Sequence, residues 1–89
     1  MATYRVKLPP TIDEVRADKI TSIKAEAYRR LLPTDWYVVR QVDTGVPVPQ
    51  EVLAYRKAVR DAADVAEQEI ASLQTIEEIR AYQVVWPEQ

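Results

Sequence analysis

The chain has no cysteine, no histidine and no phenylalanine, and its only glycine is Gly45. The lack of cysteine excludes a disulfide framework and a thiolate metal site. The lack of histidine removes the commonest general base and a major ligand of transition metals. A phosphate-binding loop needs several glycines to expose a cradle of backbone amides, so a single glycine argues against nucleotide binding. We therefore predict a non-enzymatic protein without catalytic, cofactor-binding or metal-binding residues.

Long apolar runs are also missing. No stretch of about 18 apolar residues occurs, and the first eight residues alternate polar and apolar side chains. We therefore expect neither a membrane-spanning helix nor a secretory signal, and the cytoplasm is the default location. Eighty-nine residues with 47% hydrophobic and 29% charged side chains indicate one small folded domain over residues 1–89.

The net charge is only −2, but it is unevenly spread. Residues 1–33 carry seven basic against four acidic side chains, hence +3, whereas residues 61–89 carry one against seven, hence −6. Such asymmetry can steer association with a partner or with a second copy, although solvated helix surface is its commoner meaning. An acidic chain offers few phosphate contacts, so we do not expect a nucleic-acid partner.

The amino-terminal part is predicted to be an extended arm followed by a helix. Alternating residues before a Pro-Pro pair predict an extended arm over residues 1–10. Thr11, with Glu14 three residues later, has the capping-box spacing and predicts a helix over residues 11–32. The predicted core face is Ile12, Val15, Ile20, Ile23, Ala27 and Leu31, with Arg16, Lys19, Lys24 and Glu26 facing solvent.

A second, short helix is predicted over residues 34–44. Thr34 is its candidate N-cap, and Gly45 follows the run as a helix C-cap does. The β-rich residues 36–39 keep a strand open as the alternative, but the glycine favours the helix. The Val-Pro-Val-Pro sequence after Gly45 predicts a stiff connector.

The carboxyl-terminal half is predicted to be a long or broken helix over residues 49–82 and an extended tail over residues 83–89. Thr75 and Glu78 repeat the capping spacing, so the sequence leaves open whether this is one helix or two. The predicted core face of this region comprises Val52, Tyr55, Val59, Ala62, Ala63, Ala66, Ile70 and Leu73. The predicted fold is mainly α: a small domain of three to four helices with extended arms at both ends, which are candidates to pair as a short β-ribbon.

Large aromatic residues and two arginines are the candidate functional groups. Trp36, Tyr55 and Trp86 either form the core where the helices meet or anchor a partner, since both roles suit such side chains. Arg56 and Arg60 are four residues apart and share a helix face, where their charges repel. A carboxylate from Asp35 or Asp43, or one from a partner, is expected between them.

Several short sequence motifs, called words below, occur in a characteristic order: Arg29-Arg30-Leu31-Leu32, Thr34-Asp35-Trp36, Arg40, Pro49, Tyr55-Arg56, Val59-Arg60-Asp61 and Trp86-Pro87. In the order and separation of these words, residues 29–87 resemble the phage tail assembly chaperone family and the related tail fibre assembly proteins. Two features depart from that pattern. An acidic helix over residues 62–74 replaces what is often a short loop, and Val59 stands where leucine is common.

The resemblance implies a phage-encoded protein in the cytoplasm of the bacterial host, which binds a tail protein such as the tape measure or a fibre during assembly. The candidate partner-binding residues are Trp36, Tyr37, Arg40, Tyr55, Arg56, Arg60 and Trp86. Two alternatives remain open: a small structural subunit of the virion tail or neck, and a phage-encoded binder or inhibitor of a host protein. A homo-oligomer is compatible with all three.

Overall fold

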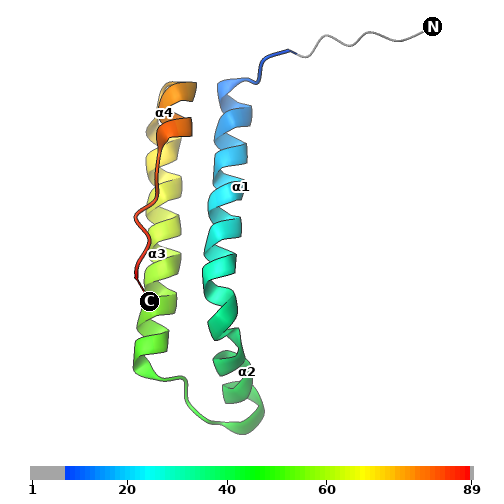
Figure 1. Ribbon diagram of the computed structural model, residues 1–89, viewed down its shortest axis with the longest axis vertical. Coiled ribbons are helices and arrows are strands. Elements are labelled where there is room, and N and C mark those ends of the chain that lie inside the picture. Colours follow the sequence, from blue (N-terminus) through cyan, green and yellow to red (C-terminus); the bar gives the residue numbers. More distant parts are fainter. Residues whose placement is uncertain (1–7, 89) are drawn as a thin grey trace, which may run out of the picture.

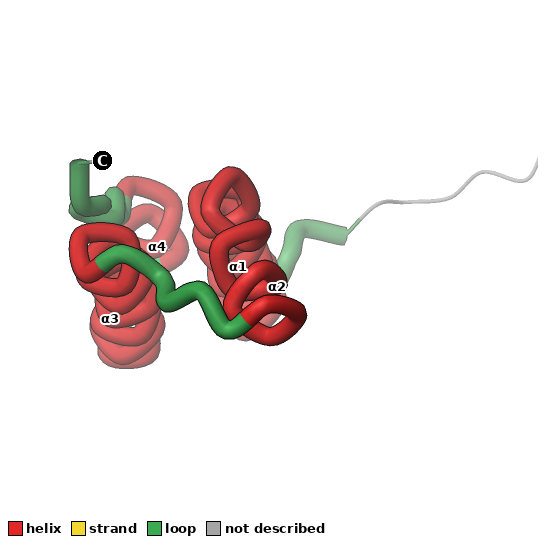
Figure 2. Tube along the Cα trace, turned by 90° about the horizontal axis from the view of Figure 1, so that it is seen from below, coloured by secondary structure: helices red, strands yellow, loops and turns green. Residues whose placement is uncertain are grey.

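The computed structural model describes residues 8–88, which form a long helical hairpin (Figure 1). In chain order the elements are α1 (Ile12–Leu31), the 3₁₀ helix η1 (Leu32–Thr34), α2 (Asp35–Thr44), α3 (Gln50–Ser72) and α4 (Ile76–Ala81). α1 and α3 lie side by side and antiparallel, and α2 continues beyond the end of α1. The connector from α2 to α3 closes one end of the hairpin (Figure 2), while the chain after α4 runs back along α3.

The prediction of a mainly α fold is confirmed, with helices as the only regular elements of residues 8–88. Residues 82–88 leave α4 without forming either helix or strand. The other half of the predicted β-ribbon, residues 1–7, lies outside the described residues. None of the helices within residues 8–88 combines the length and the apolar run needed to cross a bilayer.

Two threonine caps set the starts of α1 and α4. The Oγ1 atom of Thr11 accepts the Glu14 N–H at 3.2 Å, and that of Thr75 accepts the Glu78 N–H at 3.1 Å. In each pair the hydroxyl also donates to the glutamate carboxylate, at 3.2 and 2.9 Å, in place of the backbone N–H of a full capping box. The second cap shows that the predicted long helix is two helices, because α3 ends at Ser72.

The helix predicted around Trp36 is confirmed, and the strand alternative is wrong. Gly45 ends α2 in the left-handed conformation, with φ 75°, and its N–H donates to the Gln41 carbonyl at 2.9 Å. Thr34 is not the side-chain cap that the sequence predicted. It lies inside η1, and its hydroxyl donates instead to the Leu31 carbonyl at 2.8 Å.

The core is a single layer of apolar side chains between α1 and α3, closed at one end by α4. Three of these residues, Val59, Ile70 and Ile79, are fully buried. The small side chains of α3 let the two long helices approach closely, and each buried Val or Ile contributes about 1.5–3 kcal/mol. The complete buried cluster is Val15, Ile23, Ala27, Val59, Ala63, Ala66, Ile70 and Ile79. The predicted core faces of both helices are confirmed.

Two basic residues predicted to face solvent instead reach across the hairpin. The Nη1 atom of Arg16 donates to the carbonyls of Ile70 at 2.5 Å and Leu73 at 3.1 Å, at the end of α3. Lys19 donates from Nζ to the Arg80 carbonyl of α4 at 3.3 Å. Their long aliphatic stems let the charged groups reach the unsatisfied carbonyls of two helix C-termini, where positive charge is favourable.

Candidate functional site

Arg56 of α3 holds the junction between α1 and α2. Its Nη1 atom lies 3.1 Å from the Leu31 carbonyl, 2.7 Å from the Thr34 hydroxyl and 2.8 Å from the Asp35 carboxylate. Thr34 is buried, and its hydroxyl both accepts from Arg56 and donates to Leu31. The buried Thr34 hydroxyl therefore has both an acceptor and a donor within the junction, as a polar group shielded from water requires.

The Arg56–Asp35 ion pair is one of the three pairings that the sequence left open, and it is internal. The Arg56 side chain is 13% exposed, whereas that of Asp35 is 42% exposed. Charge-assisted hydrogen bonds to a mostly buried guanidinium are stronger than neutral ones. Arg60 is exposed one turn further along α3, and within residues 8–88 it has no ion pair with Asp43 or another carboxylate. The pair of arginines therefore does not share one carboxylate.

Trp36, Tyr37 and Arg40 form an aromatic and cationic cluster on α2. The rings of Trp36 and Tyr37 stack with their centroids 3.9 Å apart at 27°. The Arg40 guanidinium lies over both, 5.0 Å from the first centroid and 5.5 Å from the second. Its buried Nε atom has no hydrogen-bond partner within the described residues.

Of the two roles that the sequence left open for Trp36, the core role is wrong, because this side chain is 52% exposed. α2 has no buried residue and packs mainly against η1. A hairpin of two long helices has no third layer that could cover α2, so its apolar face stays at the surface. Tyr55 and Trp86, by contrast, are partly buried against the core, as predicted.

Trp86 connects the carboxyl-terminal segment to α1. The Arg30 guanidinium lies over its ring, 5.0 Å from the centroid, and the Arg30 Nε also donates to the Glu26 carboxylate at 3.2 Å. Trp86 lies in the segment that returns along α3 (Figure 1). The cation–π contact therefore fixes this segment near the α1–α2 junction, on the same part of the hairpin as Arg56.

A groove of about 540 Å³ opens between the start of α3, the junction and the end of the chain. Its lining is mainly apolar, with two carboxylates: Thr34, Glu51, Val52, Ala54, Tyr55, Ala58, Pro87 and Glu88. Residues 8–88 contain no cluster of three potential metal ligands. The groove can receive apolar side chains of another protein, which suits helix-in-groove recognition.

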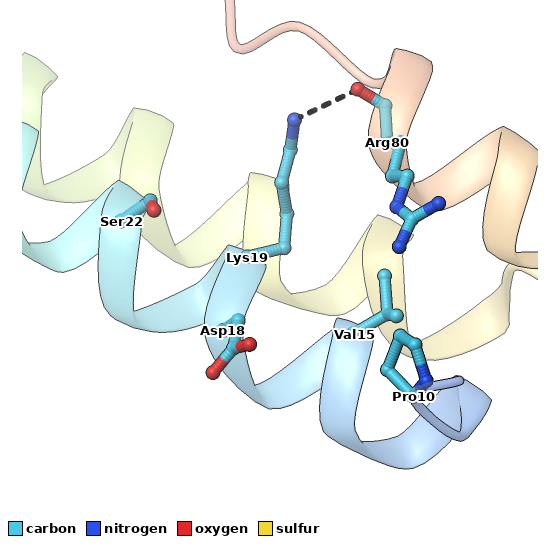
Figure 3. Close-up of a pocket in the computed structure, with 6 residues that line it drawn as sticks. All are labelled: Pro10, Val15, Asp18, Lys19, Ser22 and Arg80. Atoms are coloured by element: carbon cyan, nitrogen blue, oxygen red, sulfur yellow. Dashed lines mark hydrogen bonds between the residues drawn. The ribbon is translucent and has the colours of Figure 1, made fainter. Parts of the chain in front are cut away.

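Two smaller hollows offer less. One, of about 260 Å³, is lined by Pro10, Val15, Asp18, Lys19, Ser22 and Arg80 (Figure 3), and its Lys19 ammonium is already bonded to the Arg80 carbonyl. The other, of about 310 Å³, lies between α3 and residues 82–85. There the Tyr82 hydroxyl donates to Glu69 at 2.5 Å, and partial burial, this hydrogen bond and the carboxylate charge raise the pKa of Tyr82 to about 12.

Sequence reasoning missed the groove and the buried role of Thr34. Ala54 and Ala58, four residues apart beside Tyr55, are the signal that could have indicated the groove, because small residues at this spacing leave one helix face open. The predicted partner-binding residues divide into three groups. Tyr55 and Arg56 meet the junction, Trp36, Tyr37 and Arg40 cluster on α2, and Trp86 packs on Arg30, whereas Arg60 joins none of them.

No family model, no curated protein and no solved structure matches this chain. The architecture itself is a small antiparallel helical hairpin with an extended carboxyl-terminal segment. The resemblance to phage tail assembly chaperones stays a prediction carried by the short sequence words.

Proposed function

We propose that this protein is a phage tail assembly chaperone, which binds a tail component through the groove at the α1–α2 junction. The observation that carries the proposal is the convergence of the sequence words on which the resemblance depends. Thr34 and Asp35 meet Arg56, and Arg30 meets Trp86. Words that are far apart in the sequence thus build one junction, and Pro87 extends it into the groove.

The chemistry of the groove fits a transient client. Val52, Ala54 and Ala58 present apolar surface, and Tyr55 adds an aromatic wall with a polar end. An unfinished tail protein exposes apolar helix faces until assembly covers them, and such a face can occupy the groove in the meantime. Because the groove is short and open, binding is expected to be moderate and reversible, so that assembly can displace the chaperone.

The test compares purified particles of the presumed phage with lysate of infected cells by quantitative mass spectrometry. A chaperone is abundant in the lysate and missing from the particles. Ala58→Glu, which puts a charge into the groove, should abolish tail assembly, whereas Ala71→Glu at an exposed position of the same helix should support it. Normal tails from a folded Ala58→Glu variant would refute the groove as the client site.

The virion-subunit alternative is favoured by the carboxyl-terminal segment. Val85 is 89% exposed in a stretch without helix or strand, so its backbone is available for strand addition by a neighbouring chain or by the amino-terminal arm as a β-ribbon. Stoichiometric presence of the protein in purified particles would support this alternative and contradict a transient role. Deletion of residues 1–8 should then abolish incorporation.

A further inference from the structure

Exposed large apolar side chains gather along the end of α1 and along α2. Five of them are between 50% and 80% exposed: Tyr28, Leu32, Trp36, Val39 and Val42. They recur at intervals of four, four, three and three residues, which is the spacing of one face of a helix. We call this face the apolar stripe. None of its residues lines the groove described above.

The stripe remains one face across the 3₁₀ turn. Rotation is about 100° per residue in the α-helices and about 120° in η1. With these values Tyr28, Leu32, Val39 and Val42 lie within about 80° of each other, and Trp36 stands at one edge. Arg29 and Asp43 fall at that same edge, and both are exposed. Asp35 also falls within the stripe, and its half-exposed carboxylate is paired with Arg56 of the same chain at 2.8 Å. Apart from this neutralised group, the stripe is apolar along its centre and has one charge of each sign at its two ends.

The stripe begins abruptly. On α1 before Tyr28, the exposed residues include the polar Thr21, Ser22 and Lys24 and the small Ala25, and none is a large apolar side chain. A contiguous apolar patch of this kind on a monomer covers about 300–600 Å² and commonly marks an interface. Isolated exposed apolar residues need no such explanation, but five at helical spacing do.

We propose that the apolar stripe pairs with the same stripe of a second copy, in an antiparallel arrangement around a two-fold axis near residues 35 and 36. Leu32 of one copy is then level with Val39 of the other, and Tyr28 lies close to Val42. The two-fold axis brings the same edge of both helices to one side of the contact. Arg29 of each copy therefore meets Asp43 of the other, so the pairing forms two ion pairs.

The charges select this arrangement over a parallel one. In a parallel pair Arg29 would be level with Arg29 of the second copy, and Asp43 with Asp43, so no such ion pair would form. Arg29 already contacts Glu26 at 2.9 Å on its own helix, but its side chain is exposed and can reach both carboxylates. Asp43 has no ion pair within residues 8–88.

The size of the stripe sets the strength of the dimer. Covering one such patch on each copy buries about 600–1,200 Å² in total, the lower end of specific interfaces. We therefore expect reversible dimers with a Kd on the order of 1–100 µM. This pairing is independent of the proposed client site, because it uses a different face. A chain that dimerises without acting on tails, or acts without dimerising, would separate the two proposals.

Sedimentation velocity of the full chain between about 1 and 500 µM tests the dimer, because this range brackets the expected Kd. The expected result is a shift from monomer to dimer mass. Val39→Asp in the stripe should weaken dimerisation at least about tenfold, equal to 1.4 kcal/mol. Val65→Asp, on an exposed position of α3 outside the stripe, should leave it unchanged, with circular dichroism confirming that both variants fold.

A charge swap tests the antiparallel register. R29D and D43R should each weaken the dimer, because each places like charges together, whereas the double variant R29D/D43R should restore it. A monomer at every concentration would overturn the proposal and leave the stripe to a different protein. A dimer that Val39→Asp does not weaken would overturn the stripe as its interface. Failure of the double variant to recover would overturn the antiparallel pairing.

Discussion

The two ends of the hairpin differ in how completely the chain covers its own apolar residues. At the α4 end, three elements meet and fully bury Ile70 and Ile79. At the α2 end, α2 has no buried residue and packs mainly against η1, so the apolar stripe remains at the surface although α2 has as regular a helical pattern as α3. The buried core and the surfaces that we propose to bind other proteins therefore lie in different parts of one short chain.

Polar contacts follow the same division. At the α4 end, Arg16 and Lys19 complete two helix C-termini, so they serve local structure. At the other end, Arg56 connects three segments through one nitrogen atom, and Arg30 ties the end of the chain to α1 through Trp86. These contacts hold the bend and the groove in place where apolar packing is thin.

The largest expected effect separates the two ends directly. Ile70→Ala removes a fully buried side chain and should lower the free energy of unfolding by about 2–5 kcal/mol. Val42→Ala, at an exposed position of α2, should change it by less than about 0.5 kcal/mol. Urea unfolding at low protein concentration, where the chain is monomeric, measures both. Equal losses would mean that α2 is packed as tightly as α3.

The junction is expected to contribute less than the core. Arg56→Ala removes hydrogen bonds to Leu31, Thr34 and Asp35 and should lower the free energy of unfolding by about 1–3 kcal/mol. The loss is limited because the half-exposed Asp35 carboxylate can bind water instead. Arg60→Ala is the matched control, since this arginine on the same face has no ion pair within the described residues, and its cost should stay below about 0.5 kcal/mol. Unfolding monitored by tryptophan fluorescence reports both changes. Indistinguishable variants would show that the Arg56 contacts carry no stability.

Features controlled by neighbouring residues were predictable from the sequence. The capping pairs at Thr11 and Thr75, the glycine end of α2 and the core faces of α1 and α3 depend on spacing within one segment, and each is confirmed. The Asp35 partner of Arg56 was one of three expected sources of a carboxylate, because neighbouring positive charges need an opposite charge nearby.

Features controlled by distant segments were not predictable. Whether Trp36 is buried depends on whether another element covers α2, and helical spacing alone carries no such information. The charge of Arg16 predicts a side chain that faces solvent, yet its stem reaches the end of α3. The residue type of Thr34 predicts an N-cap, but the turn around Pro33 buries its hydroxyl. The groove needs the returning segment at Pro87, whose path no local pattern fixes.

A smaller effect is expected at Gly45, where the connector from α2 to α3 begins. Gly45 has a φ of 75°, and a Cβ added there would meet no atom within 4 Å. Gly45→Ala should therefore cost only the backbone strain of the left-handed conformation, about 1 kcal/mol. Gly45→Asn should cost less, because asparagine tolerates this conformation better. Thermal unfolding ranks the three proteins, and a larger loss for asparagine than for alanine would contradict a purely backbone effect.

The smallest effect is a pH dependence at the α4 end. Partial burial, the hydrogen bond to Glu69 and the charge of that carboxylate raise the pKa of Tyr82 to about 12, above the ordinary value of 10.0. The unfolded chain loses this proton first as pH rises, so the contribution of Tyr82 to stability is fully present below pH 10 and is lost as pH approaches 12. Tyr82→Phe has no such proton. In urea unfolding, the stability difference between the native chain and Tyr82→Phe should therefore shrink across this interval. Glu69→Gln keeps a hydrogen-bond acceptor but removes the charge. In a chain with Glu69→Gln, the stability contributed by Tyr82 should fall less across the same interval. A difference that stays constant up to pH 12 would show that Tyr82 titrates as it does in the unfolded chain.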